Sequence, residues 1–238
     1  MALTNEQIRH FRHNGYLKFD QPLPDSMVSD LKEAIWADIE AVVEPTTRDS
    51  NGRPVRLSQV LERAAIFRRA ATFGPALDAL QGLLGRQIEL VKNRHNHATL
   101  NYQSAAGDHF HRDAMQWSRS LVTLVFYLEE TTLDNGCTQL VPGTHLLPGL
   151  GYLHRLDEEE WVAASRLLHQ AVPIPMPAGG ILALDGLVFH RMGSNHTDGT
   201  RISMTMGYHS ADELDGGDDP RRLLVRGQRP YAGNDRQT

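Results

Sequence analysis

The stretch Gly107–Asp113 (GDHFHRD) places a histidine and an aspartate two residues apart, His111 and Asp113. Side chains of an extended segment alternate between two faces, so residues separated by two positions point to the same side. An imidazole and a carboxylate on one face supply two ligands of a three-ligand metal site. We therefore expect this stretch to be extended and to supply two of the three ligands of a metal centre.

The missing ligand is expected from a second, distant strand. His190, in Leu187–Asn195 (LVFHRMGSN), is the best candidate, and Arg201 follows it by eleven residues at the start of a strand-like run. Two histidines and one carboxylate with open positions are the ligand set of non-haem Fe(II) oxygenases. An arginine can bind an organic acid through two parallel hydrogen bonds. The pattern indicates an Fe(II) oxygenase with an organic-acid cosubstrate.

Sequence blocks along most of the chain resemble the phytanoyl-CoA dioxygenase family of Fe(II)/2-oxoglutarate oxygenases. They are His111-x-Asp113, Asn135–Cys137 running to Val141–His145 (VPGTH), His190 with Asn195, Arg201 at the family's spacing from the distal histidine, and the opening Phe11–Leu17 (FRHNGYL). The resemblance implies that His111, Asp113 and His190 bind Fe(II) and carry catalysis. It also implies that 2-oxoglutarate and O2 are cosubstrates, with release of succinate and CO2.

The resemblance extends to the cosubstrate site and to the reaction type. Arg201 is expected to bind the distal carboxylate of 2-oxoglutarate, and Ser203, on the same face of the strand, to donate a hydroxyl to it. Asn93 is a candidate for the other end of the cosubstrate. Halogenating relatives carry Gly or Ala where this chain has Asp113. Hydroxylation, desaturation or oxidative ring closure is therefore expected, and halogenation is not.

Two other classes of protein stay open at this point. His109 and His111 also form a His-x-His pair of the cupin type, although a cupin pair would be followed by a Glu where this chain has Met115 and Gln116. A cupin-type metalloenzyme without 2-oxoglutarate would not require Arg201. A non-catalytic jelly-roll binding module would not require an intact set of three ligands.

The periodicity of the chain predicts helices first and strands afterwards. Helices are expected at residues 4–13, 25–43, 57–71, 75–84 and 157–169, with a polar loop at 44–56 and strands from residue 87 onward. This order predicts a mainly β protein with flanking helices, built on a double-stranded β-helix (jelly-roll, cupin-like) core. We expect one domain over residues 1–238, made of a helical layer (1–86), the jelly-roll core (87–210) and a C-terminal strap (211–238).

The bulk composition fits an ordinary globular enzyme. The chain has 238 residues, of which 40% are hydrophobic and 22% charged, and its net charge of −5 argues against a nucleic-acid partner. The lone cysteine, Cys137, excludes an internal disulfide and favours a cytoplasmic location. We expect no membrane association, because no apolar run approaches the length of a span and the N-terminus lacks signal-peptide features. The oligomeric state is not indicated.

The substrate is expected to be a small molecule. Residues next to the ligands, namely Gln116, Trp117, Arg191 and Met192, are candidates for substrate contacts, and the 44–56 and 150–170 segments are candidates for covering the site. The sequence shows no basic patch suited to the phosphates of coenzyme A. Family analogy favours a polar natural-product intermediate, sugar-containing molecules included, that is hydroxylated or oxidatively cyclised.

Overall fold

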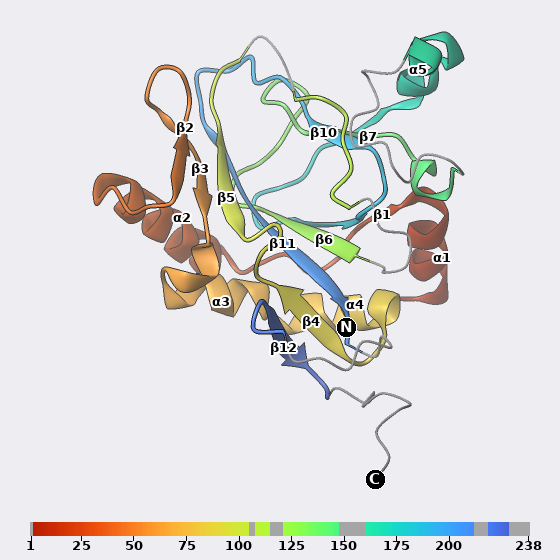
Figure 1. Ribbon diagram of the computed structural model, residues 1–238, viewed down its shortest axis with the longest axis horizontal. Coiled ribbons are helices and arrows are strands. Elements are labelled where there is room, and N and C mark those ends of the chain that lie inside the picture. Colours follow the sequence, from red (N-terminus) through yellow and green to blue (C-terminus); the bar gives the residue numbers. More distant parts are fainter. Residues whose placement is uncertain (1, 105–107, 115–120, 148–159, 212–218, 229–238) are drawn as a thin grey trace.

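The computed structural model describes residues 2–104, 108–114, 121–147, 160–211 and 219–228 (Figure 1). In these residues the helices are α1 (Asn5–Asn14), α2 (Asp25–Glu40), α3 (Ala65–Ala71), α4 (Gly74–Leu84) and α5 (Glu160–Ser165). The strands are β1 (Tyr16–Lys18), β2 (Thr46–Arg48), β3 (Pro54–Ser58), β4 (Ile88–Val91), β5 (His97–Asn101), β6 (Leu121–Tyr127), β7 (Thr138–Leu140), β8 (Val172–Ile174), β9 (Ile181–Asp185), β10 (His190–Met192), β11 (Arg201–Ser210) and β12 (Arg222–Arg226). Short 3-10 helices lie at Val60–Glu62, Thr144–Leu146 and Leu167–Gln170.

The strands form two antiparallel sheets. In the described part of the chain the larger sheet has nine strands in the order β1-β9-β6-β11-β5-β3-β2, with β4 paired to both β11 and β12. The smaller sheet has the order β10-β7-β8. The predicted jelly-roll core with flanking helices is therefore confirmed.

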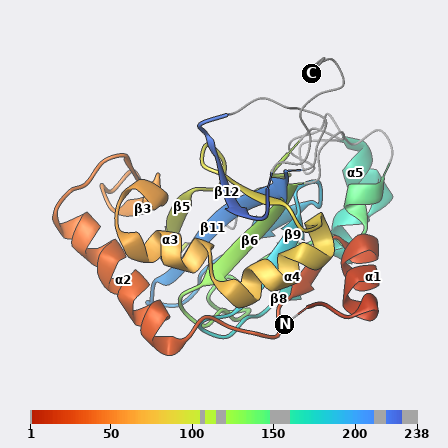
Figure 2. The same cartoon turned by 90° about the horizontal axis from the view of Figure 1, so that it is seen from below.

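Helices α2, α3 and α4 cover one face of the larger sheet (Figure 2). Along β11 the residues that point towards these helices are buried and apolar: Ile202, Met204, Met206 and Tyr208. The Tyr208 hydroxyl donates a hydrogen bond of 2.8 Å to the carbonyl of Ala71 in α3. Because strand side chains alternate, Arg201, Ser203 and Thr205 point to the opposite face, which is left free for chemistry.

The first helix begins and ends as its sequence predicts. The Thr4 hydroxyl accepts a hydrogen bond from the Gln7 backbone N–H (3.2 Å), and the Gln7 side chain accepts one from the Thr4 N–H (2.9 Å). This reciprocal arrangement is a capping box. Gly15, at φ +81°, ends the helix in the left-handed region, so the chain turns directly into β1.

The segment 44–56, predicted as a polar loop, is a β-hairpin. Strands β2 and β3 pair, and β3 also pairs with β5, so the hairpin extends the larger sheet. Asp49 closes the turn by accepting the backbone N–H groups of Asn51 and Arg53, both at 2.9 Å. The predicted helix 57–71 is correspondingly shorter: β3 runs to Ser58, and α3 begins only at Ala65. The prediction of a loop was wrong because the two strands are short and are joined by a polar turn.

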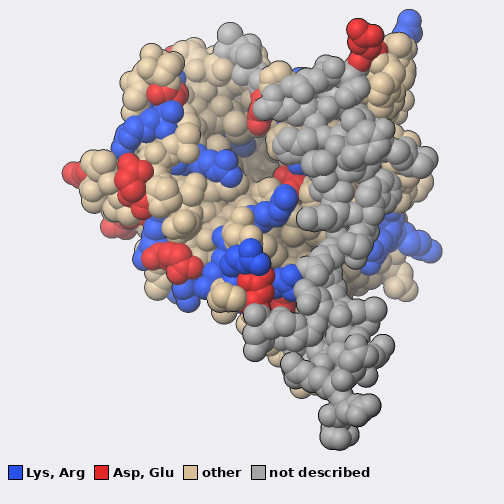
Figure 3. Space-filling view, in the orientation of Figure 1, with Lys and Arg blue, Asp and Glu red and all other residues tan. Residues whose placement is uncertain are grey.

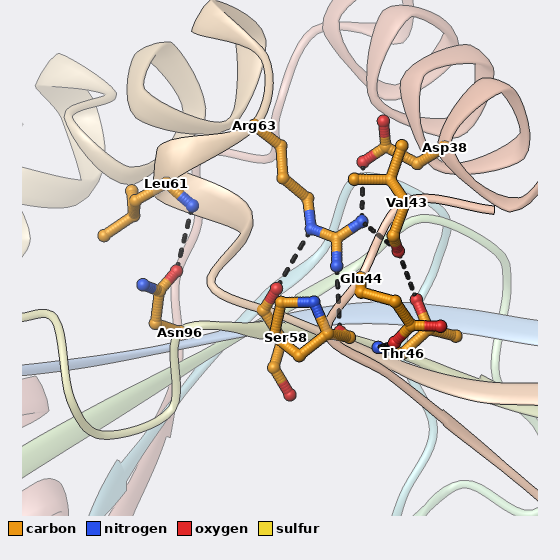
Figure 4. Close-up of polar contacts among 9 residues, drawn as sticks. Asp38, Val43, Glu44, Thr46, Ser58, Leu61, Arg63 and Asn96 are labelled. Atoms are coloured by element: carbon orange, nitrogen blue, oxygen red, sulfur yellow. Dashed lines mark hydrogen bonds and ion pairs between the residues drawn. The ribbon is translucent and has the colours of Figure 1, made fainter. Parts of the chain in front are cut away.

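Arg63 stabilises the base of this hairpin through hydrogen bonds and an ion pair (Figure 4). Its guanidinium donates to the carbonyls of Ser58 (3.0 Å), Val43 (3.3 Å) and Pro45 (2.9 Å) and pairs with Asp38 at 3.0 Å. The side chain of Arg63 is only 5% exposed. One arginine therefore links α2, the residues just before β2 and the end of β3, and so holds the hairpin in place.

Replacing Arg63 with methionine is expected to lower the free energy of unfolding by about 2–3 kcal/mol. The change removes several hydrogen bonds to a charged donor and leaves Asp38 without its partner. Urea denaturation of the variant measures this loss. Arg69→Met is the matched control, because Arg69 is exposed on α3 and makes no polar contact within the described residues. Equal stability of the two variants would show that Arg63 does not fasten the hairpin.

Other element boundaries differ from those expected. Residues 1–86 are more than a helical layer, since β1, β2 and β3 join the larger sheet. In the expected C-terminal strap, β12 pairs with β4. The predicted helix 157–169 begins outside the described residues, and its described part consists of α5 followed by a 3-10 helix. None of the helices in the described part of the chain is long and apolar enough to cross a membrane.

Candidate metal centre

Backbone pairing places His111 and His190 directly opposite each other. The His111 N–H donates to the His190 carbonyl at 2.9 Å, and the His190 N–H donates to the His111 carbonyl at 3.0 Å. A pair that exchanges both hydrogen bonds is in antiparallel register, which puts the two side chains on the same face. Their imidazole rings lie 4.6 Å apart between centroids. Two segments almost eighty residues apart in sequence are thus held together by the main chain.

Asp113 completes the group. Its carboxylate Oδ1 lies 3.5 Å from Nε2 of His190. Within the described residues, one ligand atom from each of His111, Asp113 and His190 lies within 4.8 Å of the others. Asp113 and His190 are buried and His111 is half-buried. Three such side chains converging from two segments fit the facial arrangement that leaves metal positions open for small molecules.

Backbone carbonyls fix the orientation of both imidazoles. Nδ1 of His111 lies 2.9 Å from the carbonyl of His109, and Nδ1 of His190 lies 3.1 Å from the carbonyl of Val188. A carbonyl only accepts, so each Nδ1 carries a proton, and in the neutral form of each ring Nε2 has the lone pair that can bind a metal. Burial and the neighbouring His190 lower the pKa of His111, which keeps that ring neutral. The donor set fits a divalent transition metal.

The carboxyl group of Asp113 is ionised at neutral pH. Burial raises its pKa, but the imidazoles of His190, His95 and His111 and the hydroxyl of Thr123 together lower it, and the pKa falls to about 2. Its Oδ2 atom is buried and has no hydrogen-bond partner among the described residues. A buried carboxylate with an unsatisfied oxygen is costly, and a bound cation would remove that cost.

Sequence reasoning did not single out His95, which lies against the centre. Its Nε2 is 3.4 Å from Oδ1 of Asp113, and its backbone is in the left-handed region at φ +55°. The guanidinium of neighbouring Arg94 donates to the backbone carbonyl of Asp113. Neither residue carries a spacing signal relative to Asp113. The turn that follows β4 brings them there.

His109, the alternative partner of His111, has an exposed side chain and does not line the cavity at the centre. The group that the structure assembles is His111 with Asp113 and His190, rather than a His109–His111 pair.

Arg201 and Ser203 stand on β11 on the face that points away from the helices. Arg201 is 2% exposed and Ser203 5% exposed. Burial lowers the pKa of Arg201, while nearby Tyr127, Cys137 and Glu129 raise it. The Nε atom of Arg201 has no hydrogen-bond partner among the described residues. A buried guanidinium with an unused N–H donor can bind the carboxylate of a small organic acid.

The structure places Asn93 elsewhere. Strand β4 ends at Val91, and Asn93 lies in the turn after it. There Asn93 lines a separate cavity of about 180 Å³ together with residues of β4 and β12. It is not among the residues that line the cavity at the metal centre.

A cavity of about 860 Å³ opens at the centre between the two sheets. Its floor is a set of cross-strand neighbours on β11, β5 and β3, in which Arg201 pairs with Asn101, Ser203 with Thr99, and Thr99 with Arg56. The three candidate ligands, Arg201 and Ser203 all line this one cavity. The β2–β3 hairpin contributes residues to its wall.

The expected substrate contacts are only partly described. Arg191 and Met192, on β10, line the cavity. Gln116 and Trp117 lie outside the described residues, as do residues 150–159 of the 150–170 segment.

His97, on the cavity wall, is expected to make the protein less stable in acid. Burial lowers its pKa to about 3, with Arg56 and His95 acting in the same direction. Between the unfolded value of 6.5 and about 3, the unfolded chain binds one proton more than the folded protein. The free energy of unfolding therefore falls as the pH falls through this window.

The measurement is urea unfolding of wild type and His97→Gln, each at about pH 7 and about pH 5. We expect the acid-induced loss of stability to be about 1–2 kcal/mol smaller in the variant. Identical losses in the two proteins would mean that His97 accepts a proton in the folded state.

Comparison with known proteins agrees with this geometry. The family model described as phytanoyl-CoA dioxygenase (PhyH) matches residues 11–203. Methylphosphonate hydroxylase of Gimesia maris is 27% identical over 226 residues, which cover 90% of this chain and 84% of that protein.

Two solved structures share the fold. The non-haem α-ketoglutarate-dependent epimerase SnoN from nogalamycin biosynthesis has a TM-score of 0.72 at 23% identity, covering 95% of this chain and 97% of its own. The carbocyclase SnoK from the same biosynthesis has a TM-score of 0.73 at 17% identity, covering 88% and 85%. The family match spans most of the chain and includes all three residues of the candidate centre. This protein belongs to the phytanoyl-CoA dioxygenase family and is a non-haem, Fe(II)- and 2-oxoglutarate-dependent dioxygenase.

Proposed function

We propose that His111, Asp113 and His190 hold the iron, and that Arg201 and Ser203 bind 2-oxoglutarate. The enzyme then couples conversion of 2-oxoglutarate to succinate and CO2 with oxidation of a small polar molecule. The observation that supports this most is the convergence of the three ligand groups within 4.8 Å in the cavity that also contains the buried Arg201. Iron, when bound, supplies the activation of O2.

The side chains of this chain provide orientation and a shielded site. The carbonyls of His109 and Val188 hold the two imidazoles with Nε2 available. The fork of Arg201 binds the distal carboxylate of 2-oxoglutarate, with the Ser203 hydroxyl as a second donor. Asp113, Arg201 and Ser203 are buried, which limits the access of water to these groups.

The oxidised molecule is proposed to be a polar natural-product intermediate that is hydroxylated or oxidatively cyclised, sugar-containing molecules included. The relatives and structural neighbours of this chain include a hydroxylase, an epimerase and a carbocyclase, so similar proteins carry out different reactions. A substrate panel scored by succinate release is therefore the route to the reaction. It should hold glycosylated natural products and, because of the relative in Gimesia maris, methylphosphonate.

Anaerobic absorption spectroscopy tests the proposal. Wild-type protein mixed with Fe(II) and 2-oxoglutarate is expected to give a weak visible metal-to-ligand band that neither component gives alone. A cupin-type enzyme that does not use 2-oxoglutarate, or a binding module, would give no such band. Absence of the band in correctly folded protein would contradict the proposal.

A further inference from the structure

We propose that the substrate is an anion, and that Arg56 binds its negative group with Arg191 as a second cationic contact in the same cavity. The inference rests on the proposed function, because it takes the metal centre and Arg201 to be occupied by iron and 2-oxoglutarate. It names the charge of the molecule that is oxidised and the residues that select it.

The cavity is cationic although the chain as a whole is acidic. Among the described residues its lining contains six arginines against three aspartates, an excess of three positive charges, whereas the whole chain carries −5. The charges of Fe(II) and of doubly ionised 2-oxoglutarate cancel, so the cavity keeps this excess once both are bound. Figure 3 shows Lys and Arg atoms (blue) beside the hollow on this face, next to the lobe that carries the β2–β3 hairpin.

Four of the six arginines already have other contacts or roles. Arg53 pairs with Asp49 at 2.8 Å and stacks over the ring of Tyr102. Arg94 donates to the carbonyl of Asp113. Arg112 is fully buried, donates to the carbonyl of Thr144 at 2.9 Å and lies over the ring of Phe189. Arg201 is assigned to the cosubstrate. Arg56 and Arg191 remain for the substrate.

Arg56 is held in the cavity by a neutral partner. Its Nη2 lies 3.0 Å from Nδ1 of His97. His97, with a pKa of about 3, is uncharged at neutral pH and accepts this hydrogen bond. Within the described residues no carboxylate lies at ion-pair distance from Arg56. The guanidinium is therefore oriented while its positive charge remains uncompensated, which suits bidentate binding of a carboxylate, phosphonate, phosphate or sulfonate.

Arg191, from the opposite sheet, is held in the same manner. Its Nε donates to Oε1 of Gln139 at 2.8 Å, and its guanidinium lies 4.4 Å from the ring centroid of Phe110. These partners are also uncharged, and no carboxylate of the described residues pairs with it. Two arginines from different sheets thus retain their charge on either side of one cavity. An uncharged substrate would form no ion pair with either guanidinium, whereas an anion can pair with both.

The experiment measures the charge preference of the holoenzyme. Anaerobic protein with Fe(II) and 2-oxoglutarate is titrated with small phosphonates, sulfonates, phosphates and carboxylates. Each is paired with an uncharged alcohol or amide of the same carbon skeleton, and binding is followed by the change in the visible band. We expect at least one anion to bind at least tenfold more tightly than its uncharged counterpart. The anion that binds most tightly distinguishes the four acid classes.

Variants then assign the preference. Arg56→Gln is expected to remove most of the preference for anions and Arg191→Gln part of this preference. The affinity for 2-oxoglutarate should stay unchanged in both variants. Arg56→Lys should keep part of the preference, which separates loss of charge from misfolding. Arg69→Gln, the same charge change on the exposed face of α3, should have no effect.

Lack of any preference for anions in the panel would overturn the inference, as would a preference that survives Arg56→Gln. If the band with Fe(II) and 2-oxoglutarate does not form at all, the proposed function fails instead. The two failures are therefore distinguishable in one set of samples.

Discussion

Asp113→Ala is expected to lower substrate turnover by more than about a hundredfold. Loss of an outer partner of a metal ligand already costs about 10- to 100-fold in metal affinity or activity, and loss of a ligand itself should cost more. The variant leaves two imidazoles and removes the negative charge that offsets the charge of the metal. Succinate release under saturating substrate, together with the affinity for Fe(II), measures the effect.

Asp30→Ala is the matched control for this variant, because Asp30 is an exposed carboxylate on α2. It should retain full turnover. Asp113→Ala should also unfold at a similar denaturant concentration as wild type when metal is absent, so that lost activity reflects the centre and not the fold. Unchanged activity of Asp113→Ala would remove Asp113 from the ligand set.

Arg201→Ala is expected to raise the KM for 2-oxoglutarate by roughly 30- to 5000-fold. Truncating one partner of a buried, hydrogen-bonded charge pair costs about 2–5 kcal/mol, and each 1.4 kcal/mol is a factor of ten. Arg201→Lys should lie between wild type and Arg201→Ala, since a lysine keeps the charge but not the planar fork.

The affinity for Fe(II) in the absence of 2-oxoglutarate gives a readout that separates Arg201 from the ligands. It should stay at the wild-type value in Arg201→Ala and fall in Asp113→Ala. A KM for 2-oxoglutarate that does not change in Arg201→Ala would place the cosubstrate elsewhere in the cavity.

Features that depend on a few residues at a fixed spacing were predictable from the sequence. The capping box of Thr4 and Gln7 depends on four consecutive residues, and the structure contains it. His111 and Asp113 were paired on the assumption of strand alternation. The structure brings them together with His190, although only His111 forms a β-bridge and Asp113 lies in a bend. Arg201 was identified by its spacing from His190, and it is buried in the same cavity. These signals are strong because few residue types can serve as iron ligands.

Features that depend on tertiary placement were not predictable. The β2–β3 hairpin was missed because its pairing with β5 joins segments about forty residues apart. His95 reaches Asp113 only because the chain turns after β4, with His95 at φ +55°. The sequence showed no basic patch, because Arg56 and Arg191 come from distant segments and are gathered by the two sheets. A cationic site formed by residues that are far apart in the sequence does not appear as a cluster of charges in any short stretch of sequence.

The central claim is that one iron is held by His111, Asp113 and His190 while Arg201 binds the far end of 2-oxoglutarate. Crystals grown anaerobically with Fe(II) and 2-oxoglutarate, measured at the iron absorption edge, test it most directly. We predict a single strong anomalous peak in contact with Nε2 of both histidines and with the Asp113 carboxylate, and the distal carboxylate of 2-oxoglutarate against the Arg201 guanidinium. A peak bound by other side chains, or a cosubstrate turned away from Arg201, would contradict the account.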